Sequence, residues 1–336
     1  MEKGLLLTEN VAGVNQLIDS SHPFAYDLWK KGAANNWMPT EVNMAKDVEQ
    51  WKVAGLISDD EKFLVKRCLG FFASTESLVS NNLLLSIFKY ITDGACRQYI
   101  LRQAYEESLH NATVEVCCES LNLDPREVAE AYLSIPSIKA KDDFLMSITT
   151  DLSRNDFSTK SIEGKREFLR NVITYYIICE GTFFFSGFAM LLSLGRQNKL
   201  PGISDQIRFT LRDETLHIQF GVYVINKIRE QYPEIWNIEF ESKTIEHIKE
   251  AVELEIAYAK DVLPRGLLGL NASMFIEYMQ YIANRRLEAL DLPFRYDSDK
   301  NPFPWLSEQV DVSAQTNFFE RRVRDYQQAG SLKDDF

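Results

Sequence analysis

Two short stretches of this sequence share the pattern Glu-x-x-His: Glu107-Ser-Leu-His110 and Glu214-Thr-Leu-His217, in a chain that contains only four histidines. Residues three positions apart on a helix lie one turn apart on the same face, so each stretch presents a carboxylate beside an imidazole. One helix with this pattern offers two ligands to a metal ion. Its occurrence in two places predicts a dinuclear metal site formed where two helices meet.

A lone acid precedes each Glu-x-x-His at a similar distance. Glu76 lies 31 residues before Glu107, Glu180 lies 34 residues before Glu214, and both fall in strongly apolar sequence. Each interval is long enough for a helix, a reversal and a second helix. The pattern predicts two antiparallel helix pairs, each giving one Glu from its first helix and Glu-x-x-His from its second. Ferritin-like di-metal carboxylate bundles have this arrangement.

Helical periodicity runs along most of the chain, and no run of alternating β-branched residues is bounded by hairpin turns. The capping-box pattern at Ser58-Asp-Asp-Glu61 predicts a helix from there to about Tyr90. Breaks at Asp124-Pro125 and Leu200-Pro201-Gly202 separate further helices. We expect these at about 94–121, 125–134, 163–195, 203–231, 241–263 and 271–288. The predicted fold class is all-α: a ferritin-like helical bundle that houses a dinuclear metal carboxylate site.

No low-complexity linker divides the chain, so we expect residues 1–295 to form one ferritin-like di-metal helical domain. The segment 296–336 differs in composition. It begins near the motif NPFPW, continues with polar sequence and ends in Gly330-Ser-Leu-Lys-Asp-Asp-Phe336. We expect it to be a largely flexible C-terminal tail.

The composition bears on partners and compartment. A net charge of −12 argues against binding nucleic acid through a basic surface. The five cysteines lie in apolar helical stretches without a C-x-x-C spacing, as is typical of buried thiols in a reducing compartment. The N-terminal sequence has too short an apolar run for a signal peptide. We therefore expect a cytoplasmic protein with no nucleic-acid partner.

One segment, 172–194, is long and apolar enough to span a bilayer. Glu180 sits near its middle, where a charge is costly in lipid, and the chain supplies no second span and no flanking Lys/Arg bias. A helix that is apolar all round is also what the centre of a large helical bundle requires. We expect this segment to be buried in the bundle, and we expect no membrane association.

The four acids and two histidines suggest which metals would bind. Two trivalent ions and a bridging oxide balance four carboxylates and two neutral imidazoles, and hard oxygen ligands favour iron and manganese over structural zinc. Without a metal, Glu76 and Glu180 would each need a buried ion pair, since an unpaired charge in an apolar helix is strongly penalised. Glu106 and Asp213 share the ligand faces of Glu107 and Glu214, so the spacing leaves open which acid of each doublet binds metal. Asp213 is a candidate to accept the second N–H of a metal-bound histidine.

Six stretches of the chain closely resemble the small, radical-generating subunit of class I ribonucleotide reductase: NNWMPTE, LGFFASTES, LRQAYEESLH, LRDETLH, LPRGLLGLNASMF and NPFPW. The resemblance extends from about Trp29 to Tyr326. It implies that the metals are held by Glu76, Glu107, His110, Glu180, Glu214 and His217. Of these, Glu107 and Glu214 are expected to bridge the two metals.

The same resemblance implies a route for the radical. Trp37 matches the tryptophan that relays an electron between the surface and the cofactor, with Asp213 linking it toward His110. Tyr326 matches the tail tyrosine that passes the radical to the catalytic subunit. The end of the chain, Asp334-Asp-Phe336, resembles the peptide that docks in that subunit.

One departure from the family bears on the cofactor. Most members carry a radical-storing tyrosine four residues after the first ligand histidine, where this chain has Val114. Glu76 also stands where the tyrosine-bearing members commonly have Asp. Both features resemble the tyrosine-less branch, in which a Mn(IV)/Fe(III) centre itself holds the oxidising equivalent. A pair of manganese ions, as in a related branch, and a pair of iron ions are the alternatives.

The resemblance implies a radical-generating subunit of ribonucleoside-diphosphate reductase that is active as a homodimer. It would react with dioxygen or a reduced oxygen species and reversibly oxidise a cysteine in a separate large catalytic subunit. The ribonucleotide is expected to bind that partner, because this chain has no phosphate-cradling Gly-rich loop and no cysteine pair placed to reduce a substrate.

Two other functions fit the metal pattern alone. A di-metal oxidase or monooxygenase acting on its own small substrate predicts an open hydrophobic channel to the metals. A non-enzymatic iron-binding or storage protein predicts acid-lined exit routes. Neither gives a role to Tyr326 or to the acidic end of the chain.

Overall fold

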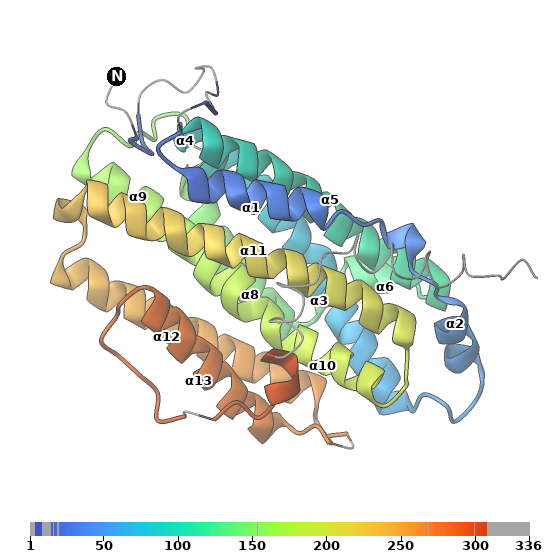
Figure 1. The fold of residues 1–336 in the computed structure, drawn as a ribbon. Helices are drawn as coiled ribbons and strands as arrows, with labels where there is room; N and C mark the ends of the chain where they lie inside the picture. Colours follow the sequence, from blue (N-terminus) through green and yellow to red (C-terminus); the bar gives the residue numbers. More distant parts are fainter. Residues whose placement is uncertain are drawn as a thin grey trace, which may run out of the picture.

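The computed structural model describes residues 4–8, 15, 17–18, 20–152, 154–267, 269–298 and 300–307. In this part of the chain there is no strand, only three isolated bridges, and the long helices lie side by side (Figure 1). The helical segments are α1 (Pro23–Ala34), η1 (Pro39–Glu41), α2 (Ala45–Lys52), α3 (Asp59–Asn82), η2 (Leu83–Ile87), α4 (Phe88–Tyr90), α5 (Gly94–Leu121), α6 (Pro125–Ala129), α7 (Ala131–Ser134), α8 (Pro136–Leu152), α9 (Ile162–Ile173), η3 (Thr174–Phe183), α10 (Phe184–Arg196), α11 (Pro201–Gln231), η4 (Pro233–Ile235), α12 (Ile238–Val262) and α13 (Ala272–Ala289).

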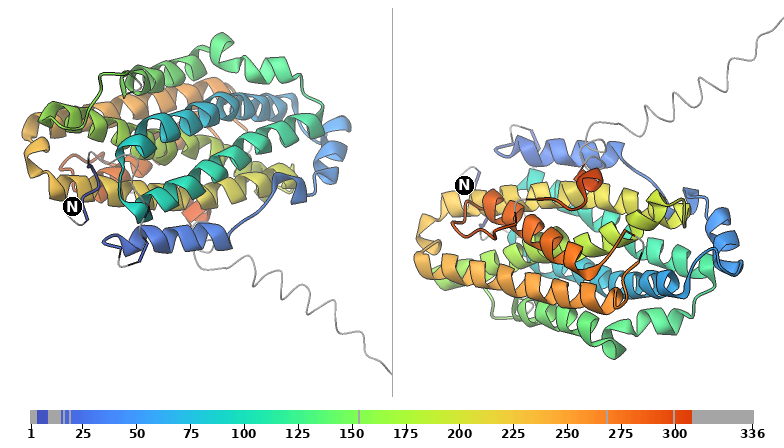
Figure 2. Two further views of the ribbon diagram at one scale, coloured as in Figure 1. Left: turned by 90° about the horizontal axis from the view of Figure 1, so that it is seen from above. Right: turned by 90° about the horizontal axis from the view of Figure 1, so that it is seen from below.

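The two predicted helix pairs form the centre of the bundle. The first runs through α3, η2 and α4 to Tyr90 and returns as α5, and the second runs through α9, η3 and α10 and returns as α11. Helix α3 packs against α5, and α10 packs against α11. Figure 2 shows α1 and α8 on opposite faces of the bundle, so the four central helices are enclosed between outer ones.

Local signals explain where the central helices begin. At α3 the predicted capping box is present: the Glu61 amide donates to Ser58 Oγ (3.2 Å) and the Ser58 amide donates to Glu61 Oε2 (2.9 Å). At α11 the cap comes from a different part of the chain. The buried carboxylate of Asp47 in α2 accepts the amides of Gly202 and Ile203 at 2.7 and 2.8 Å. A Cβ at residue 202 would lie 2.9 Å from that carboxylate, so glycine permits the close approach.

Some elements differ from the sequence prediction. Helices α1, α2 and α8 were not predicted, and α1 and α2 begin without a side-chain cap. The helix expected at 125–134 is broken at Glu130 into α6 and α7. Two π-helical segments, η2 and η3, interrupt helices that periodicity alone predicted as continuous. Each π turn adds a residue to the helix and re-aims the side chains that follow it, which is common at functional sites.

The apolar segment behaves as predicted. The run Ile162–Arg196 is long and apolar enough to cross a membrane, but its most apolar window is wholly buried inside the bundle. Phe184 and Phe188 in this run pack against Phe72 of α3, with ring centroids 5.6 and 5.4 Å apart. The five cysteines are all buried and unpaired with one another. The helix is therefore the core of the bundle.

The described part of the predicted tail packs on the bundle. Phe303 and Leu306 are each 2% exposed, and the Phe303 ring lies 5.1 Å from Phe275 and 5.0 Å from Tyr278 of α13. Residues 308–336 lie outside the described part of the chain, and with them Tyr326. The tail prediction for those residues remains a prediction.

Candidate metal centre

The six predicted ligands converge at the centre of the bundle, and each is at most 1% exposed. They come from four segments: Glu76 from α3, Glu107 and His110 from α5, Glu180 from η3, and Glu214 and His217 from α11. The two antiparallel pairs therefore contribute equally, one Glu from the first helix and Glu-x-x-His from the second. We call these six residues the metal cluster.

The cluster divides into two groups that share one residue. Ligand atoms of Glu76, Glu107, His110 and Glu214 lie within 4.8 Å of one another, as do ligand atoms of Glu107, Glu180 and His217. Glu214 also approaches the second group, since its Oε2 lies 3.3 Å from Nδ1 of His217. Glu107 and Glu214 are thus placed between the two groups, where bridging carboxylates of a dinuclear site would stand.

Unpaired polar atoms show that the cluster fits a metal pair. Buried atoms without a hydrogen-bond partner include Glu76 Oε2, Glu107 Oε2, His110 Nδ1, Glu180 Oε2 and Glu214 Oε1. His110 Nδ1 lies 3.2–3.6 Å from three carboxylates but makes a directed hydrogen bond with none of them. Each orphaned polar group costs about 1–3 kcal/mol when buried. Metal ions with a preference for oxygen and imidazole ligands would satisfy all of them together.

Without metal, protons stand in for the missing cations. Burial raises the pKa of Glu76 to about 8 and raises the pKa of Glu180 well above its ordinary range. Burial disfavours a charged imidazole at His110 and His217, yet the facing carboxylates and their hydrogen bonds outweigh it and raise both histidine pKa values well above the ordinary range. Metal binding must therefore displace protons from the cluster.

The second acid of each doublet faces the histidine of the opposite helix. Asp213 Oδ2 lies 3.6 Å from Nε2 of His110, and Glu106 Oε2 lies 2.9 Å from Nε2 of His217. Each of these outer acids also contacts an arginine: Glu106 contacts Arg102 at 2.8 Å, and Asp213 contacts Arg212 at 3.4 Å. The inner acids of the two doublets thus converge with the histidines. Of the outer acids, Glu106 lies at hydrogen-bond distance from His217, whereas Asp213 faces His110 at a longer distance.

Trp37 is connected to the cluster through Asp213. The indole is 1% exposed, and its Nε1 donates a hydrogen bond to Asp213 Oδ2 at 2.7 Å. Because the same oxygen faces His110, the structure joins Trp37, Asp213 and His110 in one line of contacts. Its ring packs on Phe209, with centroids 5.1 Å apart.

Gln103 is among the buried residues of the site that sequence reasoning missed. Its amide nitrogen contacts Glu180 at 2.9 Å and Glu107 at 3.3 Å. The available signal was its position four residues before Glu107, which places both on one helix face.

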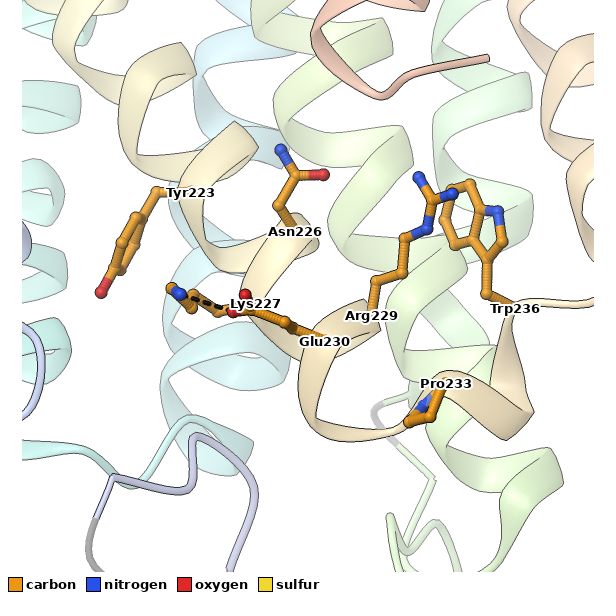
Figure 3. A pocket seen from close by; sticks show the side chains of 7 residues that line it. All are labelled: Tyr223, Asn226, Lys227, Arg229, Glu230, Pro233 and Trp236. Atoms are coloured by element: carbon orange, nitrogen blue, oxygen red, sulfur yellow. Dashed lines mark hydrogen bonds and ion pairs between the residues drawn. The ribbon is translucent and has the colours of Figure 1, made fainter. Parts of the chain in front are cut away.

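Two hollows in the described residues bear on the alternative functions. A cavity of about 10 Å³ next to Tyr175, between α3, α8 and η3, has room for about one water-sized molecule. A wider pocket opens at the surface at the C-terminal end of α11 (Figure 3), lined by Tyr223, Asn226, Lys227, Arg229, Glu230, Pro233 and Trp236. There Lys227 pairs with Glu230 at 2.5 Å and Arg229 stacks over Trp236 at 4.5 Å. This pocket contains no residue of the metal cluster.

Comparison with known proteins identifies the family to which this chain is similar. A family model described as "Ribonucleotide reductase, small chain" matches residues 14–302. The chain is 51% identical over 331 residues to the "Ribonucleoside-diphosphate reductase subunit beta" of Chlamydia pneumoniae, covering 98% of this chain and 95% of that protein. It is 28% identical to the "Ribonucleoside-diphosphate reductase small chain 1" of Saccharomyces cerevisiae, covering 91% and 72%. The fold matches the ribonucleotide reductase R2 subunit from Clostridium botulinum with a TM-score of 0.82 at 23% identity, covering 92% and 96%. The predicted ferritin-like fold class is confirmed.

Proposed function

Because this chain belongs to the ribonucleotide reductase small-chain family, we propose that it is a radical-generating subunit whose metal pair, one manganese and one iron, itself stores the oxidising equivalent. The chain is the small subunit of a ribonucleoside-diphosphate reductase and works with a large catalytic subunit. When bound, the metal pair supplies the reaction with dioxygen or a reduced oxygen species and holds one oxidising equivalent. The six residues of the metal cluster would hold the pair, and Glu107 and Glu214 lie where they could contact both metals.

The observation that carries the proposal of a metal-held oxidising equivalent is Val114. It lies on α5 one turn after His110 and is 8% exposed, so an aliphatic side chain fills the place next to the ligand histidine. Valine has no phenol to lose an electron and a proton. With the whole ligand set assembled beside it, the metal pair is left as the store of the oxidising equivalent.

A different tyrosine provides the sharpest test of that proposal. Tyr175 is buried, and its hydroxyl lies 3.4 Å from Glu107 Oε1. If the protein stored a tyrosyl radical, this residue would be the best placed to hold it. We expect the loaded protein to show no tyrosyl signal by electron paramagnetic resonance, and Tyr175→Phe to leave its spectrum unchanged. A tyrosyl signal that Tyr175→Phe removes would overturn the metal-held store.

Trp37 and Asp213 are proposed to carry the radical out of the site. Asp213 accepts the indole N–H, so it could hold the indole proton when Trp37 loses an electron and return it when the electron is restored. Burial keeps this hydrogen bond away from water, which would otherwise compete for the carboxylate. Tyr326, outside the described residues, is proposed to pass the radical to the catalytic subunit.

The remaining parts of the proposal concern assembly. We propose that residues 1–295 are the di-metal domain of a cytoplasmic homodimer, and that 296–336 is the tail that docks in the large subunit through its acidic-apolar end. Deleting the last dozen residues should abolish nucleotide reduction while leaving metal content unchanged. Tyr326→Phe should do the same without weakening binding to the large subunit. Full activity of either variant would contradict the proposed relay.

A further inference from the structure

Gln103 is not one of the six ligands, yet its side-chain amide contacts two of them. It lies on α5 and is fully buried. Its Nε2 donates to Glu180 Oε1 at 2.9 Å, and lies 3.3 Å from Glu107 Oε1 and 3.2 Å from the Tyr175 hydroxyl. Its Oε1 accepts a hydrogen bond from the Tyr176 hydroxyl at 2.9 Å.

These partners fix which way the amide points. A carboxylate can only accept hydrogen bonds, so the NH₂ group must face Glu180 and Glu107. A phenol can donate, so the amide oxygen faces Tyr176. The glutamine therefore brings a donor to the cluster without bringing a charge, and Tyr176 holds it in that orientation.

The contact restrains the orientation of the Glu180 carboxylate. Its Oε1 accepts the hydrogen bond from Gln103 and also lies 3.9 Å from Nδ1 of His217, whereas its Oε2 has no hydrogen-bond partner. A hydrogen bond to one oxygen resists rotation of the carboxylate. Gln103 thus restricts how Glu180 is presented to the rest of the metal cluster.

The other half of the site has no equivalent contact. The residue four positions before Glu214 is Thr210, and its hydroxyl donates to the backbone carbonyl of Gln206 within its own helix. Glu76, the counterpart of Glu180, receives no hydrogen bond from a side-chain amide among the described residues, and its Oε2 is unpaired. Gln103 is therefore where the approximate symmetry of the ligand set is broken.

Helix α11 leaves room for the Tyr176 ring. A Cβ at Gly221 of α11 would lie 2.1 Å from Tyr176 Cγ, so only glycine leaves room for the ring. Phe220 packs edge-on against the same ring, with centroids 5.9 Å apart. The orientation of Gln103 thus depends on Tyr176, whose ring is held in place by packing against α11.

We propose that Gln103 is a positioning residue that holds the Glu180 carboxylate in one orientation and thereby makes the two metal positions unequal. This inference rests on the proposed metal pair. The position formed by Glu107, Glu180 and His217 has a fixed carboxylate, and the position formed by Glu76 and His110 has a freer one. Such a difference gives the chain a means to place two different metals in a defined order.

The test compares metal occupancy at the two positions. Gln103→Leu removes all four polar contacts of the amide at similar volume, and Tyr176→Phe removes only the hydrogen bond to the amide oxygen. The matched control is Gln206→Leu, another fully buried glutamine, whose Nε2 donates to the Pro39 carbonyl at 2.8 Å and touches no ligand. Each protein is titrated anaerobically with Mn²⁺ and Fe²⁺, and the occupancy of each position is measured from anomalous scattering at the two metal edges.

We expect Gln103→Leu to weaken metal binding at the Glu180 position about 10–100-fold, as loss of a ligand's supporting hydrogen bond does elsewhere. The position of Glu76 should change much less, and manganese and iron should mix between positions. Tyr176→Phe should give a smaller change in the same direction, and it keeps the test open if Gln103→Leu fails to fold. Gln206→Leu should preserve the occupancy pattern.

Equal weakening at both positions, or an unchanged pattern in Gln103→Leu and Tyr176→Phe, would overturn this inference while leaving the proposed function intact. Failure of the unmodified protein to take up any metal would instead overturn the proposed function, and this inference with it.

Discussion

The bundle buries two clusters of charged side chains, and they balance their charge differently. In the first, which we call the lysine cluster, Lys141 of α8 contacts Glu255 of α12 at 2.5 Å, and Ser186 of α10 donates to the other oxygen of that carboxylate. Both charged side chains are fully buried. In the metal cluster, four carboxylates face two imidazoles, and no lysine or arginine of the described residues lies within ion-pair distance of those four.

The lysine cluster balances its charges within the chain, since Glu255 Oε2 has no hydrogen-bond partner but is ion-paired with Lys141. Besides Glu255, the Lys141 ammonium lies over the rings of Phe71 at 3.4 Å and Tyr258 at 4.1 Å. Burial lowers the pKa of Lys141 and raises that of Glu255, and each is opposed by the partner's charge. A buried ion pair with these supports needs nothing from outside.

The metal cluster is incomplete in the same sense. Arginines reach only its outer acids, Glu106 and Asp213, and the inner carboxylates keep unpaired oxygens. Since buried charges must be paired or bind metals, the cations of this cluster must come from solution. One bundle thus contains two ways of balancing buried carboxylates: a lysine of the chain in one cluster, and cations from solution in the other.

The largest effect should follow from changing the residue shared by both metal groups. Glu107→Ala removes a ligand from each group, so we expect fewer than one tightly bound metal per chain and no nucleotide reduction. Metal analysis after desalting measures this. Glu255→Ala is the matched control, since it removes a buried carboxylate but no ligand, and it should keep the metal content. Two metals retained by Glu107→Ala would break the comparison.

The next largest effect concerns stability at the lysine cluster. Lys141→Met leaves Glu255 as an unpaired buried charge, and we expect a loss of about 3–5 kcal/mol in unfolding free energy. The double variant Lys141→Met/Glu255→Leu should recover most of that loss, because it removes both charges. Denaturant unfolding of the metal-free proteins measures both. A double variant as unstable as the single one would show that the pair acts through packing and not through charge.

Metal binding should depend on pH, whereas the lysine cluster should not contribute to that dependence. Glu76, with its pKa near 8, and both histidines hold protons in the metal-free protein and must release them to bind metal. We therefore expect Mn²⁺ affinity to fall as the pH drops below 8, by about tenfold per pH unit for each proton displaced. Titrations between pH 6 and 8 measure the slope. A flat profile would contradict proton occupancy of the cluster.

The smallest effect should come from Ser186→Ala. This change removes one hydrogen bond to Glu255 and should cost about 1.5–3 kcal/mol of stability, since bonds to charged groups contribute more than neutral ones. It should leave metal content and nucleotide reduction unchanged. A loss of metal in this variant would mean that the two clusters are coupled.

The convergence of the two Glu-x-x-His pairs could be predicted from the sequence, because it follows from helical periodicity. Glu107 and His110 must share a face, and the same holds for Glu214 and His217. The contact between Glu106 and His217 could not be predicted from the sequence, because it depends on how α5 packs against α11 and not on spacing within either helix. Of the residues assigned to the radical relay, Trp37 hydrogen-bonds to Asp213, and Tyr326 lies outside the described residues.

The lysine cluster and Gln103 show what periodicity leaves out. Lys141 lies among charged and small residues, which is typical of a solvated helix face, and its helix α8 was itself not predicted. Its burial comes from packing against α12 and η3, which are distant in sequence. Gln103 carries no charge that would mark it as part of a site. The π-helical turn that holds Glu180 leaves no clear pattern in the sequence either.

The most direct test of the central claim is the manganese and iron content per chain after loading with both ions and dioxygen, followed by desalting. We predict close to one manganese and one iron per chain, without a tyrosyl radical signal. Two irons with a tyrosyl radical, two manganese ions with almost no iron, or almost no metal at all would contradict the mixed centre.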